Sequence, residues 1–338
     1  MPHDPYRALY LHLPFCVRRC GYCDFATSAV PADAPEIDAY VEDLCLQIRR
    51  KAKEGELGAL ETVYLGGGTP SHIGLARLSM LLYTLSLSMH LTPEVECTME
   101  ANPESLTERM VRDVWALGVN RLSIGVQSFD DEVLAVLGRA HSADDARRAI
   151  EAAHTRFENV SVYPLTIEAH TPFDAAVLAG DMEEPDDDVE AAHMEIAARV
   201  LAEAGYERYE VASYARPGFE CRHNIAYWTG VPYLGLGRSA ATMTQNAERR
   251  MRVQDGRVTD DMDARGMAAE DLMLGMRMTC GVPDELVEAA AVLLPDAPAV
   301  LAELEGEGLV AHADGRWRPT DRGWLCGNEL YGRLFDLA

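Results

Sequence analysis

The sequence predicts an α/β protein in which parallel strands alternate with helices, followed by a small α+β domain with a winged-helix-like pattern. Three observations favour this class. In the first 150 residues, short β-branched or aromatic runs alternate with amphipathic helical patterns. After residue 155 the alternation stops, and residues 266–338 read as helices around one hairpin. The chain has 338 residues, of which 48% are hydrophobic, so it can bury a large core.

The first two units each begin with a short strand. Residues 8–13 (ALYLHL) form the first predicted strand, and the helix after it places Ile37, Leu44 and Ile48 on one face. Residues 62–68 (TVYLGGG) form the second strand, followed by a helix whose apolar face includes Leu75 and Leu82. Both units have the strand-then-helix order that is typical of a parallel sheet.

The third and fourth units follow the same order. Residues 94–103 form the third predicted strand, and its helix begins with a capping box at Ser105 and Glu108 and ends near Gly118. Residues 121–129 form the fourth strand, followed by helical segments through about His154, the second of which has a Ser-x-x-Asp cap at Ser142. This alternation predicts right-handed crossovers in either a barrel or an open doubly wound sheet.

Sulfur-containing and polar residues fall where these strands end. Cys16, Cys20 and Cys23 follow the first strand, glycines follow the second, Glu100 ends the third and Gln127 ends the fourth. In both candidate architectures the carboxyl ends of the strands meet at one rim, which carries the chemistry. We therefore expect the functional site on this rim.

The remaining chain has a more mixed pattern. Residues 159–173 are expected to be extended, residues 181–188 are acidic, and a helix follows over about residues 189–204. Residues 206–215 form a further strand, and Asp-Gly turns predict hairpins in residues 253–258 and 308–320. The helices around the second hairpin resemble a winged helix, but too few basic residues are present for DNA binding. We interpret this region as a packing domain.

Charge and hydropathy restrict the partners of the chain. Fifty-five acidic and 30 basic residues give a net charge of -25, which repels nucleic acid and anionic lipid. The N-terminal segment does not resemble a leader and no apolar run is long enough to cross a bilayer, so we expect a cytoplasmic protein. In a reducing compartment the eight cysteines are ligands or small apolar residues rather than disulfides. Four scattered ones are interpreted as core or incidental: Cys45, Cys97, Cys280 and Cys326.

Cys16, Cys20 and Cys23 lie close together directly after a strand, which indicates a metal centre. Structural zinc needs four ligands and usually takes them from two separated pairs. A four-iron cluster held by three thiolates leaves one iron open for a substrate. Structural zinc and an incidental grouping are the alternatives, and both are disfavoured by the spacing and the position on the rim.

The spacing Cys-x3-Cys-x2-Cys in CVRRCGYC resembles the signature of the radical S-adenosylmethionine (SAM) superfamily. This resemblance implies a four-iron four-sulfur cluster whose open iron is chelated by SAM, and one electron from the cluster cleaves SAM to a deoxyadenosyl radical. Other segments resemble the coproporphyrinogen III oxidase-like branch: GGGTPS, EANPESLT, RLSIGVQSFDDEVL, YPLTIEAHTPF, YEVASYARPGFECRHNIAYW and TDRGW. The resemblance covers nearly the whole chain and implies a partial (βα) barrel, six-stranded in the family.

Roles on the rim follow from this resemblance. Cys16, Cys20 and Cys23 would hold the cluster. Contacts to SAM would come from Tyr10, Gly67, Gly68, Thr69, Glu100, Gln127 and Arg139. The alternatives are a plain turn at residues 66–68 and a solvated helix charge at Arg139. Plain roles for Glu100 and Gln127 would leave polar groups unpaired at the ends of buried strands.

Two groups within this branch differ after the third cysteine. Coproporphyrinogen III dehydrogenases carry a fourth cysteine where this chain has Phe25, and a longer segment before Tyr10. Both departures favour the sister group, the HemW heme chaperones, which bind heme and pass it to respiratory membrane enzymes. We therefore expect a heme chaperone that binds a cluster, SAM and heme, with a homodimer as an open question. The alternatives are a coproporphyrinogen III oxidase-type enzyme, which Phe25 disfavours, and a degenerate, non-catalytic iron–sulfur scaffold.

Candidate heme ligands lie in the HNxxYW pattern of the heme chaperones. His223, Asn224, Tyr227 and Trp228 match this pattern, and either His223 or Cys221 would ligate heme iron. A histidine beside a tryptophan is also typical of a core group with satisfied hydrogen bonds. The family's GAHS is replaced by GRSAAT at residues 237–242, which weakens the assignment of the heme site.

One βα unit of the family has no counterpart in this chain. The family has a strand with an Asp, a GLPGQT-like loop and a helix before YPLTIEAHTPF, whereas this chain runs from FENV directly into SVYPLTIE. A βα unit takes about 30 residues, more than lie between Phe157 and Tyr163. We expect an incomplete barrel wall and weaker SAM affinity than in full-length relatives. The expected domains are residues 1–215 (partial barrel), 216–265 (connecting region with HNxxYW and a hairpin) and 266–338 (C-terminal domain).

Overall fold

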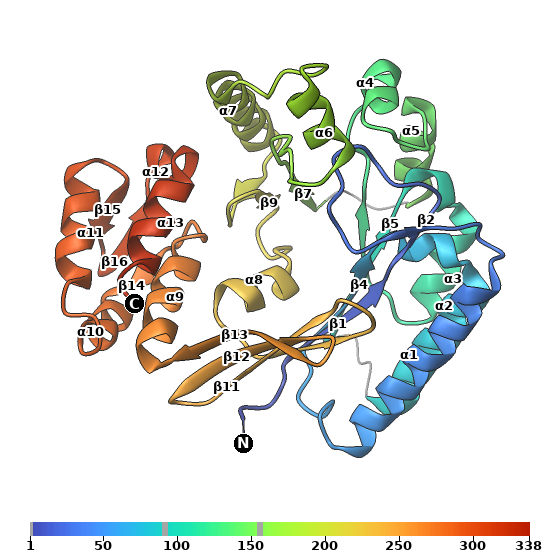
Figure 1. Ribbon diagram of the computed structural model, residues 1–338, viewed down its shortest axis with the longest axis horizontal. Helices are drawn as coiled ribbons and strands as arrows, with labels where there is room; N and C mark the ends of the chain where they lie inside the picture. Colours follow the sequence, from blue (N-terminus) through green and yellow to red (C-terminus); the bar gives the residue numbers. More distant parts are fainter. Residues whose placement is uncertain (1–2, 90–93, 154–157) are drawn as a thin grey trace.

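An eight-stranded sheet with the order β13-β12-β11-β10-β1-β4-β5-β6 dominates the computed structural model, which describes residues 3–89, 94–153 and 158–338 (Figure 1). Neighbouring strands are parallel from β10 to β6 and antiparallel from β10 to β13. The predicted α/β class is therefore confirmed. The strands are β1 (Ala8–Leu13), β4 (Thr62–Gly67), β5 (Glu96–Ala101), β6 (Arg121–Ile124), β10 (Tyr233–Leu236), β11 (Ala241–Gln245), β12 (Arg249–Gln254) and β13 (Arg257–Asp263).

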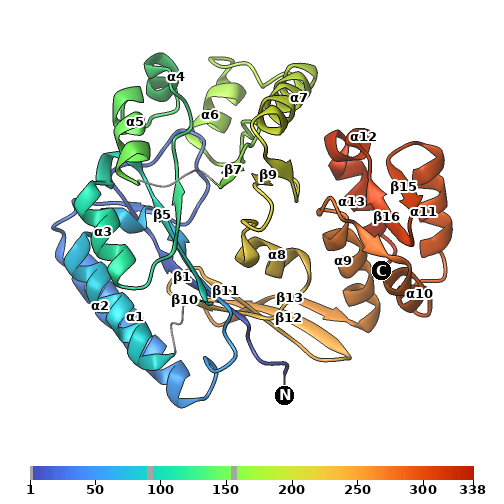
Figure 2. The same cartoon turned by 180° about the vertical axis from the view of Figure 1, so that it is seen from behind.

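Three helices cover one face of the parallel strands, as Figure 2 shows from behind. On the first helix, Ile37, Leu44 and Ile48 recur at helical spacing and are fully buried. They pack in one hydrophobic cluster with Leu11 and Val63 of the sheet. Burying each such side chain stabilises the fold by about 1.5–3 kcal/mol. These helices are α1 (Pro35–Lys53), α2 (Leu75–Ser88) and α3 (Glu108–Ala116).

The capping box predicted at Ser105 is wrong. Helix α3 begins at Glu108, and its N-cap is Thr107, whose hydroxyl accepts a hydrogen bond from Met110 N at 3.2 Å. Ser105 instead ends a short 3₁₀ turn, η2 (Pro103–Ser105). The proline at the start of this turn favours a tight turn over an early start of α3.

The cap predicted at Ser142 is confirmed. Ser142 and Asp145 form a reciprocal capping box at the start of α5 (Ala143–Ala152). The predicted continuation through about His154 lies outside the described residues.

The parallel part of the sheet ends at β6. The next strand, β7 (Asn159–Ser161), pairs antiparallel with β9 (Ser213–Ala215), which also pairs with β8 (Glu207–Arg208). The strand predicted over residues 206–215 is thus two short strands, because the chain turns back between them. Within the described ranges no strand pairs with the outer edge of β6, where Ser123 is exposed. The helices of this region are α4 (Asp131–Val136), α6 (Pro172–Ala179) and α7 (Asp187–Glu203).

Both predicted Asp-Gly hairpins are present. Asp255 and Gly256 have φ of 48° and 75°, and Asp314 and Gly315 have φ of 53° and 70°. Positive φ at both central residues is what a two-residue hairpin turn requires, and Asp and Gly tolerate it. None of the described helices is long and apolar enough to cross a membrane.

The C-terminal region has a hydrophobic cluster of its own, centred on residues such as Leu272, Leu301 and Leu330. Its three-stranded sheet consists of β14 (Val282–Pro283), β16 (Arg316–Pro319) and β15 (Val310–Ala313), in that order. The helices are α9 (Ala264–Gly275), α10 (Asp284–Ala291), α11 (Ala297–Gly306), α12 (Asp321–Leu325) and α13 (Gly327–Phe335); α8 (Arg222–Trp228) precedes β10.

Candidate functional site

The three cysteines of the rim lie on one loop between β1 and α1. Cys16 ends the short strand β2 (Phe15–Cys16), which pairs with β3 (Ser28–Ala29). The loop is anchored at Gly21, whose carbonyl accepts a hydrogen bond from Phe173 N at 3.0 Å. A Cβ at Gly21 would lie 2.2 Å from the Phe173 ring, so glycine allows the loop to pack against the start of α6.

Two of the three sulfurs have hydrogen-bond donors beside them. The Thr69 hydroxyl lies 3.5 Å from Cys16 Sγ, and Arg139 Nη1 lies 3.5 Å from Cys20 Sγ. Burial raises the pKa of the Cys16 and Cys23 thiols, so both are protonated at neutral pH until a metal displaces the protons. The nearby donors and the guanidinium charge favour the thiolate form that iron binds.

The three thiols of this loop are the ligand type that holds an iron–sulfur cluster. Within the part of the chain that the structure describes, no group of three or more His, Cys, Asp or Glu side chains surrounds one ion position. A structural zinc ion would need four such ligands. Three thiols on one loop with donors beside their sulfurs are what a thiolate-held cluster uses.

Gly67 and Gly68 hold the end of β4 against the cysteine loop. Gly67 has φ of 113°, and a Cβ there would lie 2.5 Å from the His12 ring. A Cβ at Gly68 would lie 2.8 Å from both the backbone N and O of Phe15. The N–H of Gly67 donates to the Glu100 carboxylate at 3.1 Å, and that of Gly68 donates to the last carbonyl of β1 at 2.9 Å. Both N–H groups are therefore engaged within the protein.

Glu100 lies near the carboxyl end of β5, and Tyr10 lies in the middle of β1. Tyr64 OH donates to Glu100 Oε1 at 2.9 Å, and Gly67 N donates to Oε2. Burial raises the pKa of Glu100, and these two hydrogen bonds oppose the rise. The Tyr10 ring stacks on the Tyr64 ring at 6.2 Å, and its hydroxyl lies 3.0 Å from His12 Nδ1. The structure thus links Tyr10 to Glu100 through Tyr64.

For Gln127 and Arg139, the structure contradicts one argument each about their burial. Gln127 is exposed and has φ of 65°, so the argument from a buried, unpaired amide is wrong for this residue. Its place in a left-handed turn after β6 turns it toward solvent. Arg139 is only 8% exposed, and Nη2 donates at 2.8 Å to the Gly125 carbonyl and to Asn102 Oδ1. The alternative of a solvated helix charge is therefore wrong, because Arg139 is buried in a loop.

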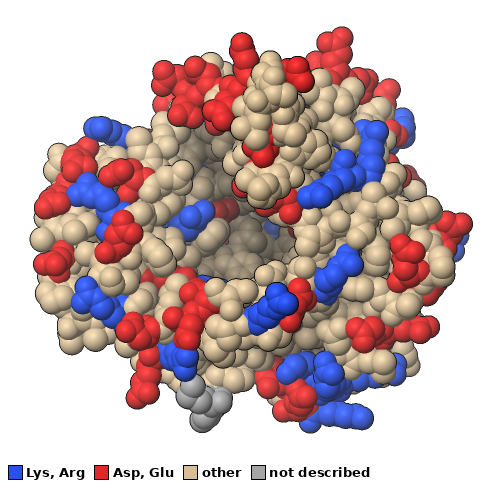
Figure 3. Space-filling model, viewed as in Figure 1, with Lys and Arg blue, Asp and Glu red and all other residues tan. Residues whose placement is uncertain are grey.

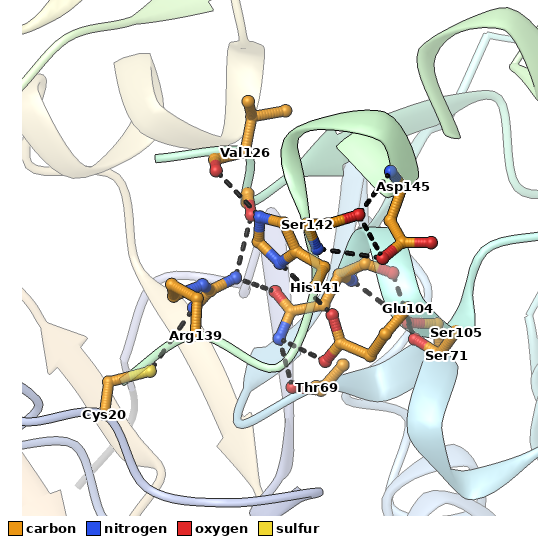
Figure 4. Close-up of polar contacts among 12 residues, drawn as sticks. Cys20, Thr69, Ser71, Glu104, Ser105, Val126, Arg139, His141, Ser142 and Asp145 are labelled. Atoms are coloured by element: carbon orange, nitrogen blue, oxygen red, sulfur yellow. Dashed lines mark hydrogen bonds and ion pairs between the residues drawn. The ribbon is translucent and has the colours of Figure 1, made fainter. Parts of the chain in front are cut away.

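Sequence reasoning missed a polar network beneath the rim (Figure 4). Asn102 connects Thr69, Arg139 and Glu104 through its side-chain amide. Below it, the hydroxyls of Ser71 and Ser105 lie 2.6 Å apart. The only signal in the sequence is the EANPESLT segment, whose polar residues after a strand are also typical of a solvated turn.

Cys221 and His223, the candidate heme ligands, are 5% and 1% exposed. Burial raises the pKa of Cys221 to about 12, and its Sγ donates to the Glu96 carboxylate at 3.4 Å. His223 Nδ1 lies 2.8 Å from the Thr62 hydroxyl and Nε2 lies 3.1 Å from Tyr227 OH. Burial lowers the pKa of His223 to about 3. This geometry favours the alternative of a core histidine with satisfied hydrogen bonds.

A hollow opens on the face shown in Figure 3, between the C-terminal helices and the parallel strands. Charged side chains gather around its rim, whereas its floor is mostly uncharged.

The fold and the cysteine loop together define a radical SAM protein. The family model of the radical SAM superfamily matches residues 10–172, and that of the HemN C-terminal domain matches residues 262–326. The chain is similar in fold to coproporphyrinogen III oxidase (HemN) from Escherichia coli, with a TM-score of 0.76, 19% identity, and coverage of 98% of this chain and 90% of that chain.

The particular family follows from relatives that match almost the entire chain. The heme chaperone HemW of Mycobacterium tuberculosis (strain ATCC 25618 / H37Rv) is 33% identical over an alignment of 381 positions, which covers 99% of this chain and 96% of that protein. HemW of Escherichia coli (strain K12) is 30% identical and covers 96% of this chain and 97% of that protein. The chain belongs to the HemW family.

Proposed function

We propose that this chain is a heme chaperone that holds a four-iron four-sulfur cluster, SAM and heme, and that passes heme to respiratory membrane enzymes. The observation that carries the proposal is 33% identity to a heme chaperone along 99% of this chain. The loop with Cys16, Cys20 and Cys23 supports the cluster, and the hollow of Figure 3, with its mostly uncharged floor, supports a bound ligand. A cytoplasmic location and a homodimer belong to the same proposal.

Cys16, Cys20 and Cys23 would hold the cluster, which supplies an open iron for SAM and a source of one electron. Glu100 and Arg139 present a carboxylate and a guanidinium on the same rim, which suits the amino and carboxylate groups of SAM. The full set of proposed SAM contacts is Tyr10, Gly67, Gly68, Thr69, Glu100, Gln127 and Arg139. Because the N–H groups of the two glycines are engaged elsewhere, these glycines contribute by keeping the space beside the loop clear.

Heme would enter the hollow, whose mostly uncharged floor presents few ionic groups that an apolar macrocycle would have to desolvate. Ligation by Cys221 or His223 would break the core hydrogen bonds of either residue. We keep both as proposed ligands to be tested by substitution with Ala. Loss of the shifted heme absorption band in one variant identifies the ligand, and an unchanged band in both excludes them.

A coproporphyrinogen III oxidase-type enzyme has less support. Phe25, which is 64% exposed, occupies the position of the enzymes' fourth cysteine. At 19% identity, the similarity to HemN supports a shared fold and not a shared activity. A degenerate scaffold is favoured by one observation: among the described residues no strand pairs with the outer edge of β6, as an incomplete barrel wall would require.

The finer features of the fold are part of the proposal. The alignments with the HemW proteins of Mycobacterium tuberculosis and Escherichia coli span 381 and 374 positions, more than the 338 residues of this chain. Both relatives therefore contain residues without a counterpart here, and the open edge of β6 supports loss of one βα unit. The domain limit at residue 265 is supported by the C-terminal hydrophobic cluster, and the winged-helix-like character of residues 266–338 is supported by a three-stranded sheet among helices; the limit at residue 215 stays part of the proposal.

The missing unit has a consequence for SAM. Because part of the wall beside the rim is absent, we expect a higher SAM dissociation constant than in a full-length relative. Titration calorimetry on both reconstituted proteins measures the difference, and equal dissociation constants would contradict the expectation.

Anaerobic reconstitution tests the proposed function. We expect a brown protein with about four irons per chain, and a Cys20→Ala variant with far less. Heme titration then separates the candidates: a shifted heme absorption band without turnover of coproporphyrinogen supports the chaperone. Turnover with release of deoxyadenosine supports the enzyme instead, and a loaded cluster without heme or SAM binding supports the scaffold.

A further inference from the structure

We propose that Asn102 is a positioning residue, whose side-chain amide holds the Thr69 hydroxyl and the Arg139 guanidinium as hydrogen-bond donors on the sulfurs of Cys16 and Cys20. The inference rests on the proposed cluster and goes beyond it, because it assigns control of the cluster's reduction potential to a residue that does not contact the cluster.

The contacts form a continuous path between the two sulfurs. Thr69 Oγ1 lies 3.5 Å from Cys16 Sγ and accepts a hydrogen bond from Asn102 Nδ2 at 3.0 Å. On the other side, Asn102 Oδ1 accepts from Arg139 Nη2 at 2.8 Å, and Arg139 Nη1 lies 3.5 Å from Cys20 Sγ. Figure 4 shows the part of this path from Thr69 to Cys20. One amide thus contacts both donors.

The count of hydrogens determines the direction of each bond. The Thr69 hydroxyl has one hydrogen, and because its oxygen already accepts from Asn102, that hydrogen is available for Cys16. Arg139 Nη2 uses its two hydrogens on Asn102 and the Gly125 carbonyl, so Nη1 is the donor for Cys20. Both sulfurs therefore receive a hydrogen.

The neighbours of Asn102 permit only one orientation of its amide. Nδ2 faces the Glu104 carboxylate at 3.2 Å, which only accepts, and Oδ1 faces the Arg139 guanidinium, which only donates. A flipped amide would place a donor against the guanidinium and an acceptor against the carboxylate. The direction of the hydrogen bonds is therefore fixed on both sides.

The backbone of Asn102 is also held in place. Its carbonyl accepts from Ser105 N and Ser105 Oγ, both at 3.1 Å, and its N–H donates to Ser71 Oγ at 3.3 Å. Thr69 is 1% exposed and Arg139 is 8% exposed, so water has little access to compete for either donor. The amide is a rigid support for both.

Hydrogen bonds to cluster sulfurs raise the reduction potential, because they stabilise the additional negative charge of the reduced cluster. Outer hydrogen-bond partners of metal ligands also affect retention, and their loss typically costs about 10- to 100-fold in metal affinity. Without the amide, Thr69 and Arg139 can turn away from the sulfurs. We therefore expect a lower potential and faster loss of iron.

The test compares Asn102→Leu, which keeps the volume but removes both polar ends, with Asn120→Ala as a matched control. Asn120 bonds Cys97 N and the Val95 carbonyl, both at 2.8 Å, at the opposite end of β5. Anaerobic potentiometric titration, followed by electron paramagnetic resonance of the reduced cluster, gives the potential. A ferrous chelator gives the rate of iron loss.

We expect Asn102→Leu to shift the potential to a more negative value and to lose iron about tenfold faster, with the control unchanged. An unchanged reduction potential in a folded, fully loaded Asn102→Leu variant overturns the role of Asn102 and leaves the proposed function standing. If that variant does not fold, Thr69→Val replaces it, since it removes only the hydroxyl, and an unchanged potential there also overturns the inference. Failure of the unmodified protein to take up iron overturns both the inference and the proposed function.

Discussion

Replacing Gly68 by Ala should displace the cysteine loop from the end of β4. The added Cβ would lie 2.8 Å from the backbone N and O of Phe15 and 2.9 Å from the carbonyl carbon of Pro14. These are backbone atoms directly before Cys16, so no side-chain rotation can relieve the clash. Overpacking of this kind costs about 1–3 kcal/mol. Two hydrogen bonds at the same contact, from Gly68 N and Thr69 N, are worth about 1 kcal/mol each.

The expected loss for Gly68→Ala, with both hydrogen bonds broken, is therefore about 3–5 kcal/mol in the free energy of unfolding, with impaired binding of iron. Gly306→Ala is the matched control, because a Cβ in this helix end meets nothing within 4 Å and Ala favours helix by about 1 kcal/mol. Urea unfolding followed by circular dichroism measures both. A Gly68→Ala variant with the stability and iron content of the unmodified protein would refute the reasoning.

Two further predictions concern buried charge. Burial lowers the pKa of His223 to about 3, so His223 is neutral in the folded protein and protonated in the unfolded chain below about pH 6.5. The contribution of neutral His223 to the free energy of unfolding is complete above pH 6.5 and is lost as the pH falls toward 3. By pH 5 the loss is about 2 kcal/mol, which urea unfolding at pH 7 and pH 5 can measure. The His223→Gln variant should lose less stability between these two pH values. Arg250, which is 2% exposed and lies 2.6 Å from the Glu270 carboxylate, joins β12 to α9. Arg250→Met should cost about 3–5 kcal/mol, whereas Arg249→Met, which removes an exposed ion pair, should cost less than about 1 kcal/mol. Equal costs in urea unfolding would show that burial does not strengthen the first pair.

Local chemistry explains why parts of the fold could be predicted from the sequence. The alternation of strands and helices in the first units depends on the periodic spacing of apolar residues such as Ile37 and Ile48. This spacing can be read within a short segment of the sequence. The hairpin turns at Asp255 and Asp314 depend on the tolerance of Asp-Gly for positive φ. The prediction of the N-cap of α3 was wrong because both Ser105 and Thr107 are residue types that cap helices, and only the turn that begins at Pro103 selects between them.

The sequence by itself determined which residues are the candidate ligands of a cluster, because the spacing of Cys16, Cys20 and Cys23 is local and thiols are the ligands that such clusters take. Tertiary structure alone decided the surroundings of each group. Whether Gln127 faces solvent, whether His223 has partners for both ring nitrogens, and which amide supports Arg139 depend on residues that are distant in the chain. Burial and hydrogen bonding are properties of the packed molecule, and no local pattern of residues contains them.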